Sequence, residues 1–333
     1  MIERLLIFAP NWLGDAVMAL PAIAQVARAM PSATVDVAAR PSVAPLFSMV
    51  DGVRQTIVLA RGRGDAETIR TGGYAAALLL PNSFNVAHLA RQAGIPERWG
   101  YRGDFRSLLL TRGVSPPTRL HQTEYYRHLV EALGFGDEKD GDPNVPKLRA
   151  TADQRATGAA RLAREGWDGR TPLVAMAPGA AFGGAKRWPA AAFGELASSL
   201  SADGVRTVLI GSAGDAPGAT EMLASVRTTL PLVNLVGKTD LTELAAVLVQ
   251  CRALVTNDSG AMHFAAALGV NVTAMFGPTR ERETHPRGPG RHTVLTHPTW
   301  CRPCMLRECP LTHRCMTGIS VDAVLRATRP FLA

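Results

Sequence analysis

The strongest constraint on the fold of this chain is an alternation of short apolar runs with amphipathic helical segments, and it occurs twice. Short apolar runs bounded by turn residues are typical of buried strands, and intervening helices favour parallel pairing. The strands that we expect cover residues 5–9, 34–38, 57–60, 76–80, 173–177, 206–210, 253–256 and 272–276. The helices that we expect cover residues 15–29, 121–133, 189–200, 221–227, 241–250, 263–268 and 321–332. This rhythm predicts an α/β protein whose parallel sheets are covered by helices on both faces.

Residues 134–146 separate the two halves. This stretch is rich in glycine, proline and acidic residues, as exposed linkers are. A chain of 333 residues also fits two domains of about 150 residues better than one core. We therefore predict two Rossmann-like domains, residues 1–150 and residues 151–318, whose parallel sheets face each other across a cleft. In such sheets, ligands bind beyond the carboxyl ends of the strands.

Composition narrows the classes of protein and partner. Hydrophobic residues make up 47% of the chain and charged residues 19%, a balance typical of a folded globular protein. No apolar run reaches the roughly 18 residues that span a bilayer, and the N-terminal apolar stretch is too short for a secretory signal. We therefore expect a cytoplasmic protein that meets a membrane only from its surface. The net charge of +8 suits nucleic acid, anionic lipid head groups or phosphorylated sugars, but no nucleic-acid-binding motif is visible.

Positive charge is dense between Arg98 and Arg119. Within this stretch Arg102, Arg106 and Arg112 stand against a single acidic residue, Asp104. Two interpretations are open. The arginines form a solvated surface, or they form a binding site for an anionic acceptor.

The first motif, PNWLGD at residues 10–15, directly follows the first predicted strand. Gly14 permits a tight turn, and Asp15 then opens the helix. One interpretation is that Asp15 caps this helix by accepting backbone N–H bonds. The other is that Asp15 is a general base at the floor of the cleft, where it would take the proton of an attacking hydroxyl.

The second motif, APGAAFGGAKRWP at residues 177–189, follows the first strand of the second half and precedes a helix. Its small residues let backbone N–H groups approach an anion, and Lys186 and Arg187 add full charges, a combination that suits a pyrophosphate. The alternative is a glycine-rich connector with surface charges. Neither a P-loop nor the G-x-G-x-x-G fingerprint is present, which disfavours ATP hydrolysis and an NAD-dependent enzyme.

The third motif, VTNDSGAMH at residues 255–263, also joins a strand to a helix. We expect the N–H groups of Ser259, Gly260 and Ala261 to face phosphate. Asp258 is itself negative, so hydrogen bonding to sugar hydroxyls suits it better, and the alternative is a plain N-cap. His263 lies one turn into the helix, where a position facing the core is an alternative to ligand binding.

Metal-binding candidates are few. An Asp-x-Asp pair, which many metal-dependent transferases use, occurs at Asp140 and Asp142, but it lies in the predicted linker and we expect a solvated loop. Four cysteines with the spacing C-x2-C-x4-C-x5-C enclose His313, and only one C-x2-C pair is present. They are Cys301, Cys304, Cys309 and Cys315. A structural metal site, reduced structural thiols and redox pairing all remain open.

These motifs, in this order, resemble those of glycosyltransferase family 9. The matching stretches are residues 11–22, 178–189, 234–248, 256–269, 276–279 and 301–310. The resemblance implies a GT-B fold, with the donor held mainly by the C-terminal domain and the acceptor by the N-terminal one. It also implies that residues 319–333 form a helix that packs back on the N-terminal domain.

The resemblance further implies an inverting enzyme of lipopolysaccharide core biosynthesis with no obligatory metal cofactor. The implied donor is ADP-L-glycero-D-manno-heptose, and the implied acceptor is heptosyl-Kdo2-lipid A at the cytoplasmic face of the inner membrane. A sibling member of the family with another donor or acceptor is an alternative. A non-catalytic nucleotide-sugar-binding protein is another, although retention of Asp15, Lys186 and Asp258 together argues against it.

By the same resemblance, Asp15 is the general base, Lys186 neutralises the leaving pyrophosphate, and Asp258 holds the heptose. The implied donor-binding residues are Gly179, Lys186, Arg187, Gly237, Lys238, Thr239, Asp258, Ser259, Gly260 and His263, with 237–239 against the adenosine. The expected acceptor-binding residues are Asn11, Gly14, Arg61, Arg63, Arg102, Arg119 and His121.

Overall fold

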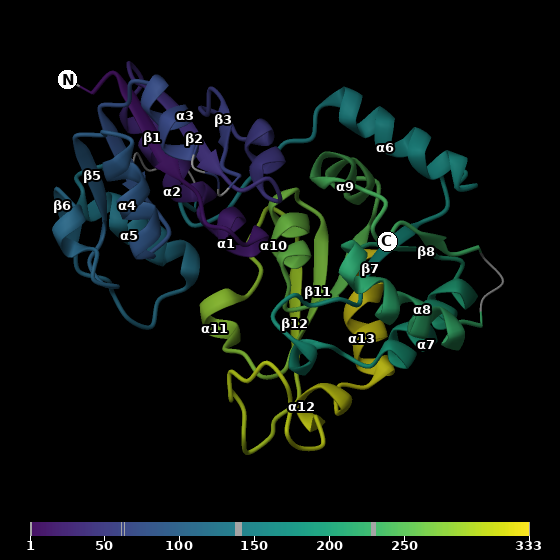
Figure 1. Cartoon of the computed structure of the whole chain (residues 1–333). Coiled ribbons are helices and arrows are strands. Elements are labelled where there is room, and N and C mark those ends of the chain that lie inside the picture. Colours follow the sequence, from purple (N-terminus) through teal and green to yellow (C-terminus); the bar gives the residue numbers. More distant parts are fainter. Residues whose placement is uncertain (1, 61, 63, 137–141, 228–230, 333) are drawn as a thin grey trace. The chain divides into compact units, whose positions relative to one another are not determined.

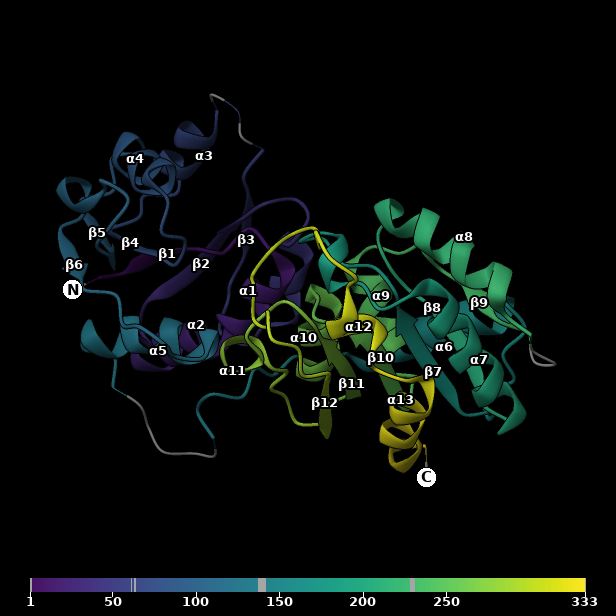
Figure 2. The ribbon, with the colours of Figure 1, turned by 90° about the horizontal axis from the view of Figure 1, so that it is seen from below.

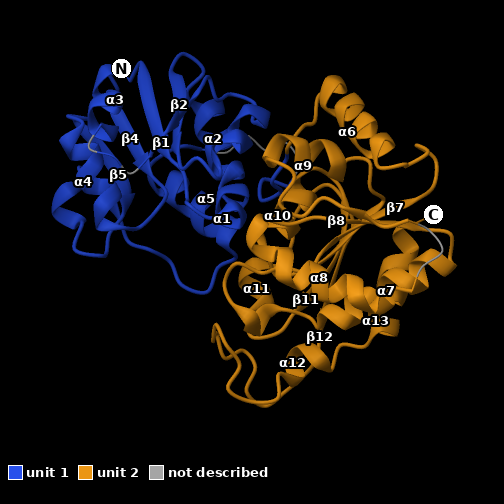
Figure 3. Ribbon diagram, turned by 45° about the vertical axis from the view of Figure 1, so that its right-hand side comes forward, with its two compact units in different colours: residues 1–147 blue, residues 148–333 orange. Residues whose placement is uncertain are grey.

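The chain forms two compact units, residues 1–147 and residues 148–333 (Figure 3). The computed structural model describes residues 2–60, 62, 64–136, 142–227 and 231–332. The division lies close to the boundary that we predicted after residue 150. Each unit is a six-stranded parallel sheet between two layers of helices, so the predicted fold class is confirmed.

In the first unit the strands are arranged in the order β3-β2-β1-β4-β5-β6. They are β1 (Arg4–Phe8), β2 (Thr34–Ala39), β3 (Thr56–Val58), β4 (Ala76–Leu79), β5 (Glu97–Tyr101) and β6 (Arg112–Val114). Strand β1 is central because Leu5 pairs with Val35 on one side and with Ala76 on the other. Strands β2 and β3 extend the sheet on one side of β1, and strands β4 to β6 extend it on the other side. The carboxyl ends of β1 and β4 are therefore the switch point of the sheet.

The helices of the first unit lie on both faces of this sheet. They are α1 (Leu13–Met18), α2 (Leu20–Ala29), α3 (Asp65–Thr71), α4 (Phe84–Gln92) and α5 (Gln122–Ala132), with 3-10 turns η1 (Ala44–Met49) and η2 (Ser107–Leu109). Helices α2 and α5 pack together on one face, and α3 and α4 on the other (Figure 2). The single helix that we predicted over residues 15–29 is divided into α1 and α2, since Pro21 has no N–H to continue the ladder.

The second unit repeats the strand order of the first: β12-β11-β10-β7-β8-β9. Its strands are β7 (Leu173–Ala177), β8 (Arg206–Leu209), β9 (Val233–Asn234), β10 (Ala253–Asn257), β11 (Asn271–Phe276) and β12 (His292–Thr296). The first strand, β7, lies between β8 and β10. The switch point is therefore between β7 and β10, where the second and third sequence motifs begin.

The helices of the second unit also form two layers. They are α6 (Ala152–Arg164), α7 (Ala190–Ala202), α8 (Ala216–Ser225), α9 (Leu241–Leu248), α10 (Gly260–Ala267), α11 (Glu281–Thr284), α12 (Arg314–Thr317) and α13 (Val321–Thr328), with 3-10 turns η3 (Gly184–Lys186), η4 (Ala213–Asp215) and η5 (Arg329–Phe331). Helices α6, α9 and α10 cover one face, and α7, α8 and α13 the other (Figure 1). Gly158 lets α6 and α9 touch, because a Cβ there would lie 1.9 Å from the Ala246 carbonyl oxygen.

The terminal helix α13 packs within the second unit, against α7 and β11. Val324 and Leu325 join the same buried cluster as Phe193 of α7, and Ile319 accepts a hydrogen bond from the Trp188 indole at 2.8 Å. We predicted that this helix packs back on the N-terminal domain. Its apolar residues Val324 and Leu325 are buried inside the second unit, and the packing on the N-terminal domain stays a prediction.

Each strand predicted from the sequence overlaps an observed one, and the strands that were missed are β5, β6, β9 and β12. Strands β6 and β9 are only three and two residues long. Strand β12 lies at the edge of the second sheet and is only half-buried. Edge strands of this kind carry little apolar signal.

None of the helices in the described ranges combines the length and the apolar composition that crossing a bilayer needs.

Candidate active site

Three loops of the second unit come together at the switch point between β7 and β10. They cover residues 178–189 after β7, residues 258–259 after β10 and residues 277–280 after β11. Asn257, fully buried at the end of β10, joins the first two. Its Nδ2 donates to the Pro178 carbonyl at 2.8 Å, and its Oδ1 accepts from the Trp188 N–H at 2.9 Å. A single amide therefore holds both ends of the loop after β7.

Lys186 and Asp258 form an ion pair at this point. Lys186 Nζ lies 2.6 Å from Asp258 Oδ2, and the two side chains are only 14% and 6% exposed. The hydroxyl of Thr279 donates to the same oxygen at 2.7 Å. The N-cap residue of α10 (Gly260–Ala267) is Ser259, so the interpretation of Asp258 as an N-cap is wrong. The pair places a cation and a hydrogen-bonding carboxylate, both largely shielded from water, at the position where open α/β sheets bind ligands.

The glycine-rich loop uses two of its N–H groups inside the protein. Gly184 donates to Glu308 Oε1 at 2.9 Å, and Ala185 donates to the Arg307 carbonyl, also at 2.9 Å. Gly183 has a φ of +154°, and a Cβ there would lie 2.3 Å from the Arg307 carbonyl oxygen. The small residues at 183–185 thus allow close packing of a second segment. That other N–H groups of the loop face a pyrophosphate stays a prediction. The charged side chain of Arg187 is exposed.

Gly179 lies at the carboxyl end of β7 against the turn that follows β8. A Cβ at Gly179 would lie 2.0 Å from Asp215 Oδ1, so a side chain here would require the Asp215 carboxylate to move. Gly237, with a φ of +71°, donates its N–H to the Gly211 carbonyl at 2.9 Å. The predicted adenosine segment, residues 237–239, therefore lies beside the turn after β8. Within it, the exposed Lys238 ammonium donates to the Asn234 carbonyl at 3.0 Å.

Helix α10 begins at Gly260, with Ser259 as its N-cap residue. The Ser259 hydroxyl bonds to the Thr256 hydroxyl at 3.1 Å. His263 is buried, and burial lowers its pKa to about 4. The buried imidazole agrees with the core-facing interpretation, and a role for His263 in donor binding stays a prediction.

In the first unit, Asp15 lies in the first turn of α1, whose N-cap residue is Trp12. Asp15 is therefore not the N-cap residue of this helix. Burial raises the pKa of the Tyr126 hydroxyl well above its usual value, and the Asp15 charge raises it further. This places the carboxylate near a buried phenol of α5. The general-base role remains a prediction.

A cavity of about 460 Å³ opens at the carboxyl ends of β1, β2 and β3 in the first unit. Asn11 and the largely exposed Trp12 line one side, and Arg40 lines another. Arg40 donates to the Asn11 side-chain oxygen at 3.3 Å and to the Leu59 carbonyl at 3.2 Å. Sequence reasoning did not select Arg40, although an arginine two residues after a predicted strand was a usable signal.

The other predicted acceptor residues differ in their surroundings. Arg102 and Arg119 are exposed, and Gly14 lies in the first turn of α1. His121 is buried as the N-cap of α5, where its Nδ1 accepts from the Thr123 N–H at 3.2 Å, which gives it a structural role at that helix. Two further predicted residues, Arg61 and Arg63, lie outside the described residues, as does Asp140.

Arg106 is fully buried, unlike the surface residue that a charged stretch suggests. It donates to the Tyr101 carbonyl at 2.8 Å, to the Pro81 carbonyl and to the Asn82 side chain. Burial lowers its pKa to about 10. The guanidinium therefore joins the ends of β4 and β5.

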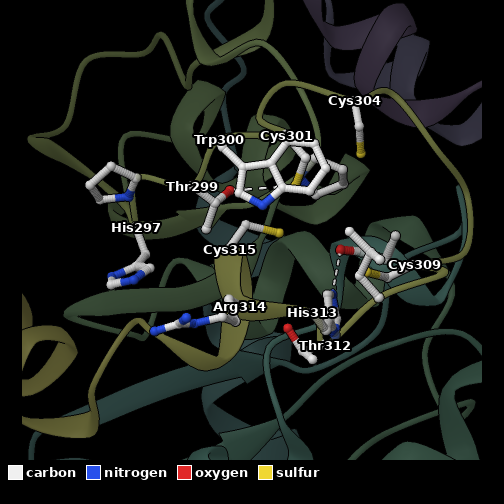
Figure 4. Close-up of a pocket in the computed structure, with 14 residues that line it drawn as sticks. His297, Thr299, Trp300, Cys301, Cys304, Cys309, Thr312, His313, Arg314 and Cys315 are labelled. Atoms are coloured by element: carbon white, nitrogen blue, oxygen red, sulfur yellow. Dashed lines mark hydrogen bonds between the residues drawn. The ribbon is translucent and has the colours of Figure 1, made fainter.

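The four clustered cysteines line a cavity of about 320 Å³ together with His297 and His313 (Figure 4). All five cysteines of the chain, each a described residue, are free thiols. Within the described part of the chain, no three His, Cys, Asp or Glu side chains gather as ligands for a metal ion. The structural-metal interpretation is thus not supported. Burial raises the pKa of the Cys315 thiol, and the neighbouring thiols raise it further.

The cysteine-bearing segment connects two loops of the site. Arg302 donates to the Gly277 carbonyl at 2.7 Å, and Met305 donates to the Pro278 carbonyl at 2.9 Å. At its other end, His313 Nε2 bonds to the Ala185 carbonyl at 2.7 Å. Together with Arg307 and Glu308, these contacts join the loop after β7 to the loop after β11. The segment acts as a scaffold for both loops.

Two Rossmann-like units, with charged groups held at the carboxyl edge of the second, are the architecture of GT-B glycosyltransferases that use a nucleotide sugar. The sequence matches the model of glycosyltransferase family 9 (heptosyltransferase) over residues 65–314. The chain belongs to that family, as its motifs predicted, and it is a glycosyltransferase.

Curated relatives and a solved structure agree with this assignment. Lipopolysaccharide heptosyltransferase 2 of Escherichia coli K12 is 32% identical over 299 residues, which cover 85% of each chain. Lipooligosaccharide heptosyltransferase 2 of Haemophilus influenzae is 33% identical over 305 residues, 85% of this chain and 86% of the relative. The structure of E. coli ADP-heptose lipopolysaccharide heptosyltransferase II matches with a TM-score of 0.85 at 29% identity, over 99% of this chain and 98% of that one.

Proposed function

We propose that this protein transfers heptose from ADP-L-glycero-D-manno-heptose to the heptosyl-Kdo2-lipid A inner core, with inversion at the anomeric carbon. The observation that carries the proposal is the shielded Lys186–Asp258 pair at the switch point of the second unit. The similar proteins reported above support it. Two are named heptosyltransferase 2, and the structure from E. coli is that of an ADP-heptose lipopolysaccharide heptosyltransferase II.

The second unit would hold the donor, and Lys186 would act on its diphosphate. As the acceptor oxygen bonds to C1, the bond from C1 to the phosphate oxygen breaks and negative charge grows on the departing ADP. A lysine already fixed in a shielded site stabilises that charge more in the transition state than in the ground state. Asp258, held by the Thr279 hydroxyl, would accept hydrogen bonds from the sugar.

The first unit would hold the acceptor and supply the base. Asp15 would take the proton of the attacking hydroxyl, so that an alkoxide-like oxygen reaches C1 as ADP leaves. The cavity beside Asn11 and Arg40 would take part of the phosphorylated inner core. Because that acceptor is a lipid, the enzyme would work at the cytoplasmic face of the inner membrane while remaining peripheral to it.

The test is a transfer assay with ADP-heptose and a panel of acceptors that end in Kdo, in one heptose or in two. We expect a mass increase of one heptose on the acceptor that ends in one heptose, with no added metal. Wild-type protein that transfers no heptose to any acceptor would contradict the proposed function. Preference for the acceptor ending in Kdo would point to a sibling activity of the family.

The proposed base is tested by Asp15→Asn in the same assay. General-base catalysis contributes about 100-fold to 10,000-fold, so kcat should fall by that factor while the melting temperature stays near the wild-type value. The matched control is Asp51→Asn, since Asp51 is an exposed aspartate of the same unit that precedes β3, at the opposite edge of the sheet. Full activity of the Asp15 variant would contradict the general-base role of Asp15 but would leave the proposed transferase activity intact.

A further inference from the structure

The connection between β5 and β6 in the first unit presents two apolar side chains to solvent. Phe105 is 95% exposed and Leu108 is 93% exposed. The two residues are only three positions apart in the sequence. Two such exposed large apolar side chains so close together are unusual on a surface that contacts only water. The donor and acceptor residues described above do not account for them.

This exposure is built into the backbone. Asp104 and Phe105 have φ values of +47° and +55°, a conformation that non-glycine residues rarely adopt. On one side, Asp104 Oδ2 accepts the Phe84 N–H at 3.0 Å, and on the other, Arg106 is fully buried and bonded to Tyr101. The segment is therefore fastened at both flanks of Phe105, and the phenyl ring projects because its neighbours are anchored.

Leu108 is presented in a similar way. It lies in the short turn η2, next to Leu109, which is buried in the core beneath α4. A third apolar side chain, the partly exposed Phe84, begins α4 and is joined to the segment by its bond to Asp104. We call residues 102–109 together with Phe84 the tip; Phe105 and Leu108 are its most exposed apolar side chains.

Residues 102–109 have a net charge of +1, from Arg102 and the buried Arg106 against Asp104. Arg102 is exposed at the start of the segment, and its aliphatic stem lies over Gly113 of β6. The one acid of the segment, Asp104, is engaged by the Phe84 N–H. A protruding apolar tip beside an exposed arginine suits a fluid, anionic surface, because head-group phosphates pair with guanidinium while acyl chains receive the apolar groups.

We propose that residues 102–109, with Phe84, dock this protein on an anionic lipid bilayer, with Phe105 and Leu108 inserted below the head groups and Arg102 bonded to phosphate. The segment follows the carboxyl end of β5, at the same edge of the first sheet as the Asn11–Arg40 cavity. Docking there would bring the proposed acceptor site to the membrane. The proposal rests on the proposed function in that the acceptor is a membrane lipid.

The docking is tested by sedimentation of the full chain with vesicles of phosphatidylcholine alone or mixed with phosphatidylglycerol. The wild-type protein should bind the mixed vesicles, and the double variant Phe105→Ser with Leu108→Ser should bind them about tenfold or more weakly. Arg102→Gln should weaken binding to the mixed vesicles and reduce its sensitivity to salt. The matched control is Trp300→Ser, because Trp300 is an exposed apolar side chain of the second unit.

Wild-type-like binding by the double variant would overturn the proposal, and so would an equal loss in the Trp300 variant. Failure of wild-type protein to bind either vesicle would also overturn it and would favour a protein partner for the tip. A second readout separates this from the proposed function. On a deacylated, soluble acceptor the double variant should keep wild-type turnover, whereas on acceptor embedded in vesicles its turnover should fall about tenfold. If the wild-type protein transfers heptose to neither acceptor, the proposed function fails while sedimentation still decides the docking.

Discussion

The two units share one strand order but differ in how the carboxyl edge of the sheet is built. In the second unit the edge is fastened: Asn257 holds one loop at both ends, Lys186 is paired with Asp258, and Glu308 binds a glycine N–H. In the first unit the edge is more open, with a cavity beside Asn11 and a largely exposed Trp12. The same topology therefore supports a prearranged charged site in one case and an accessible surface in the other.

The difference follows the chemistry proposed for each unit. A small, highly charged donor profits from groups that are fixed before it arrives, because their reorganisation would otherwise cost free energy during the reaction. A large amphiphilic acceptor needs room and a surface to approach. Substitutions at the carboxyl edge of the second sheet should therefore have larger effects on activity and stability than substitutions at the carboxyl edge of the first.

Among the substitutions that test this contrast between the two sheet edges, the largest effect is expected for Lys186→Ala. Removal of this ammonium deprives the leaving diphosphate of its fixed cation, and kcat should fall about 100-fold to 1,000-fold in a transfer assay. It also leaves Asp258 shielded and unpaired, so the melting temperature should fall. Lys186→Arg, which keeps the charge, should recover part of both losses. A variant with near wild-type kcat would show that the fastened edge is not the donor site.

The next effect concerns pH and the buried His263. Its folded pKa of about 4 lies below the ordinary value of 6.5. Between these values the unfolded chain takes up a proton that the folded chain does not, so stability should decrease as pH falls from about 6.5 towards 4. The decrease contributed by this group should reach at most about 3 kcal/mol.

Denaturant titrations across that pH range measure this slope. His263→Gln should make it shallower, because this titrating group is gone; the half-buried His292, whose pKa is also lowered by burial, would still contribute. An unchanged slope in the His263 variant would contradict the assignment to burial.

A smaller loss of stability is expected for Asn257→Ala. The substitution leaves the Trp188 N–H and the Pro178 carbonyl without their buried partner, which should cost about 2 kcal/mol of unfolding free energy. Asn11→Ala in the first unit removes one long, exposed bond to Arg40 and should change stability by no more than about 0.5 kcal/mol. Equal losses at the two sites would remove the contrast between the fastened and the open edge.

The smallest effect is expected for Glu308→Ala. Loss of the bond to the Gly184 N–H should loosen the glycine-rich loop, and the KM for the ADP-sugar should rise about fivefold with little change in kcat. Glu308→Gln keeps an accepting oxygen and should have a weaker effect. If KM is unchanged in both variants, the cysteine-bearing segment does not position the donor loop.

Much of the fold was accessible from the chain alone. The strands at the centre of each sheet are continuous apolar runs, and each was predicted at the observed place within a residue or two. The three motifs were also found, because glycine, asparagine and aspartate directly after a strand are a local signal. The short strand β9 gave no such signal, since two residues have no periodicity to detect.

The environment of single charged residues was harder to predict. Arg106 was grouped with arginines expected on a solvated surface or in an anion-binding site, but the structure buries it between the ends of β4 and β5. His121 was assigned to the acceptor, and the structure uses it to cap α5. The sequence shows which groups are charged, whereas burial depends on which distant elements cover them.

The sequence by itself determined the two α/β units, their parallel sheets and the identity of the motif residues, because these depend on patterns among neighbours in the chain. Tertiary structure alone decided that Asn257 meets Pro178, 79 residues away, and that Gly184 meets Glu308, 124 residues away. It also decided that α13 completes the core of the second unit. Such pairings follow from strand order and close packing, which bring together segments that are far apart in the sequence. The local sequence of one segment does not indicate which distant segment it will contact.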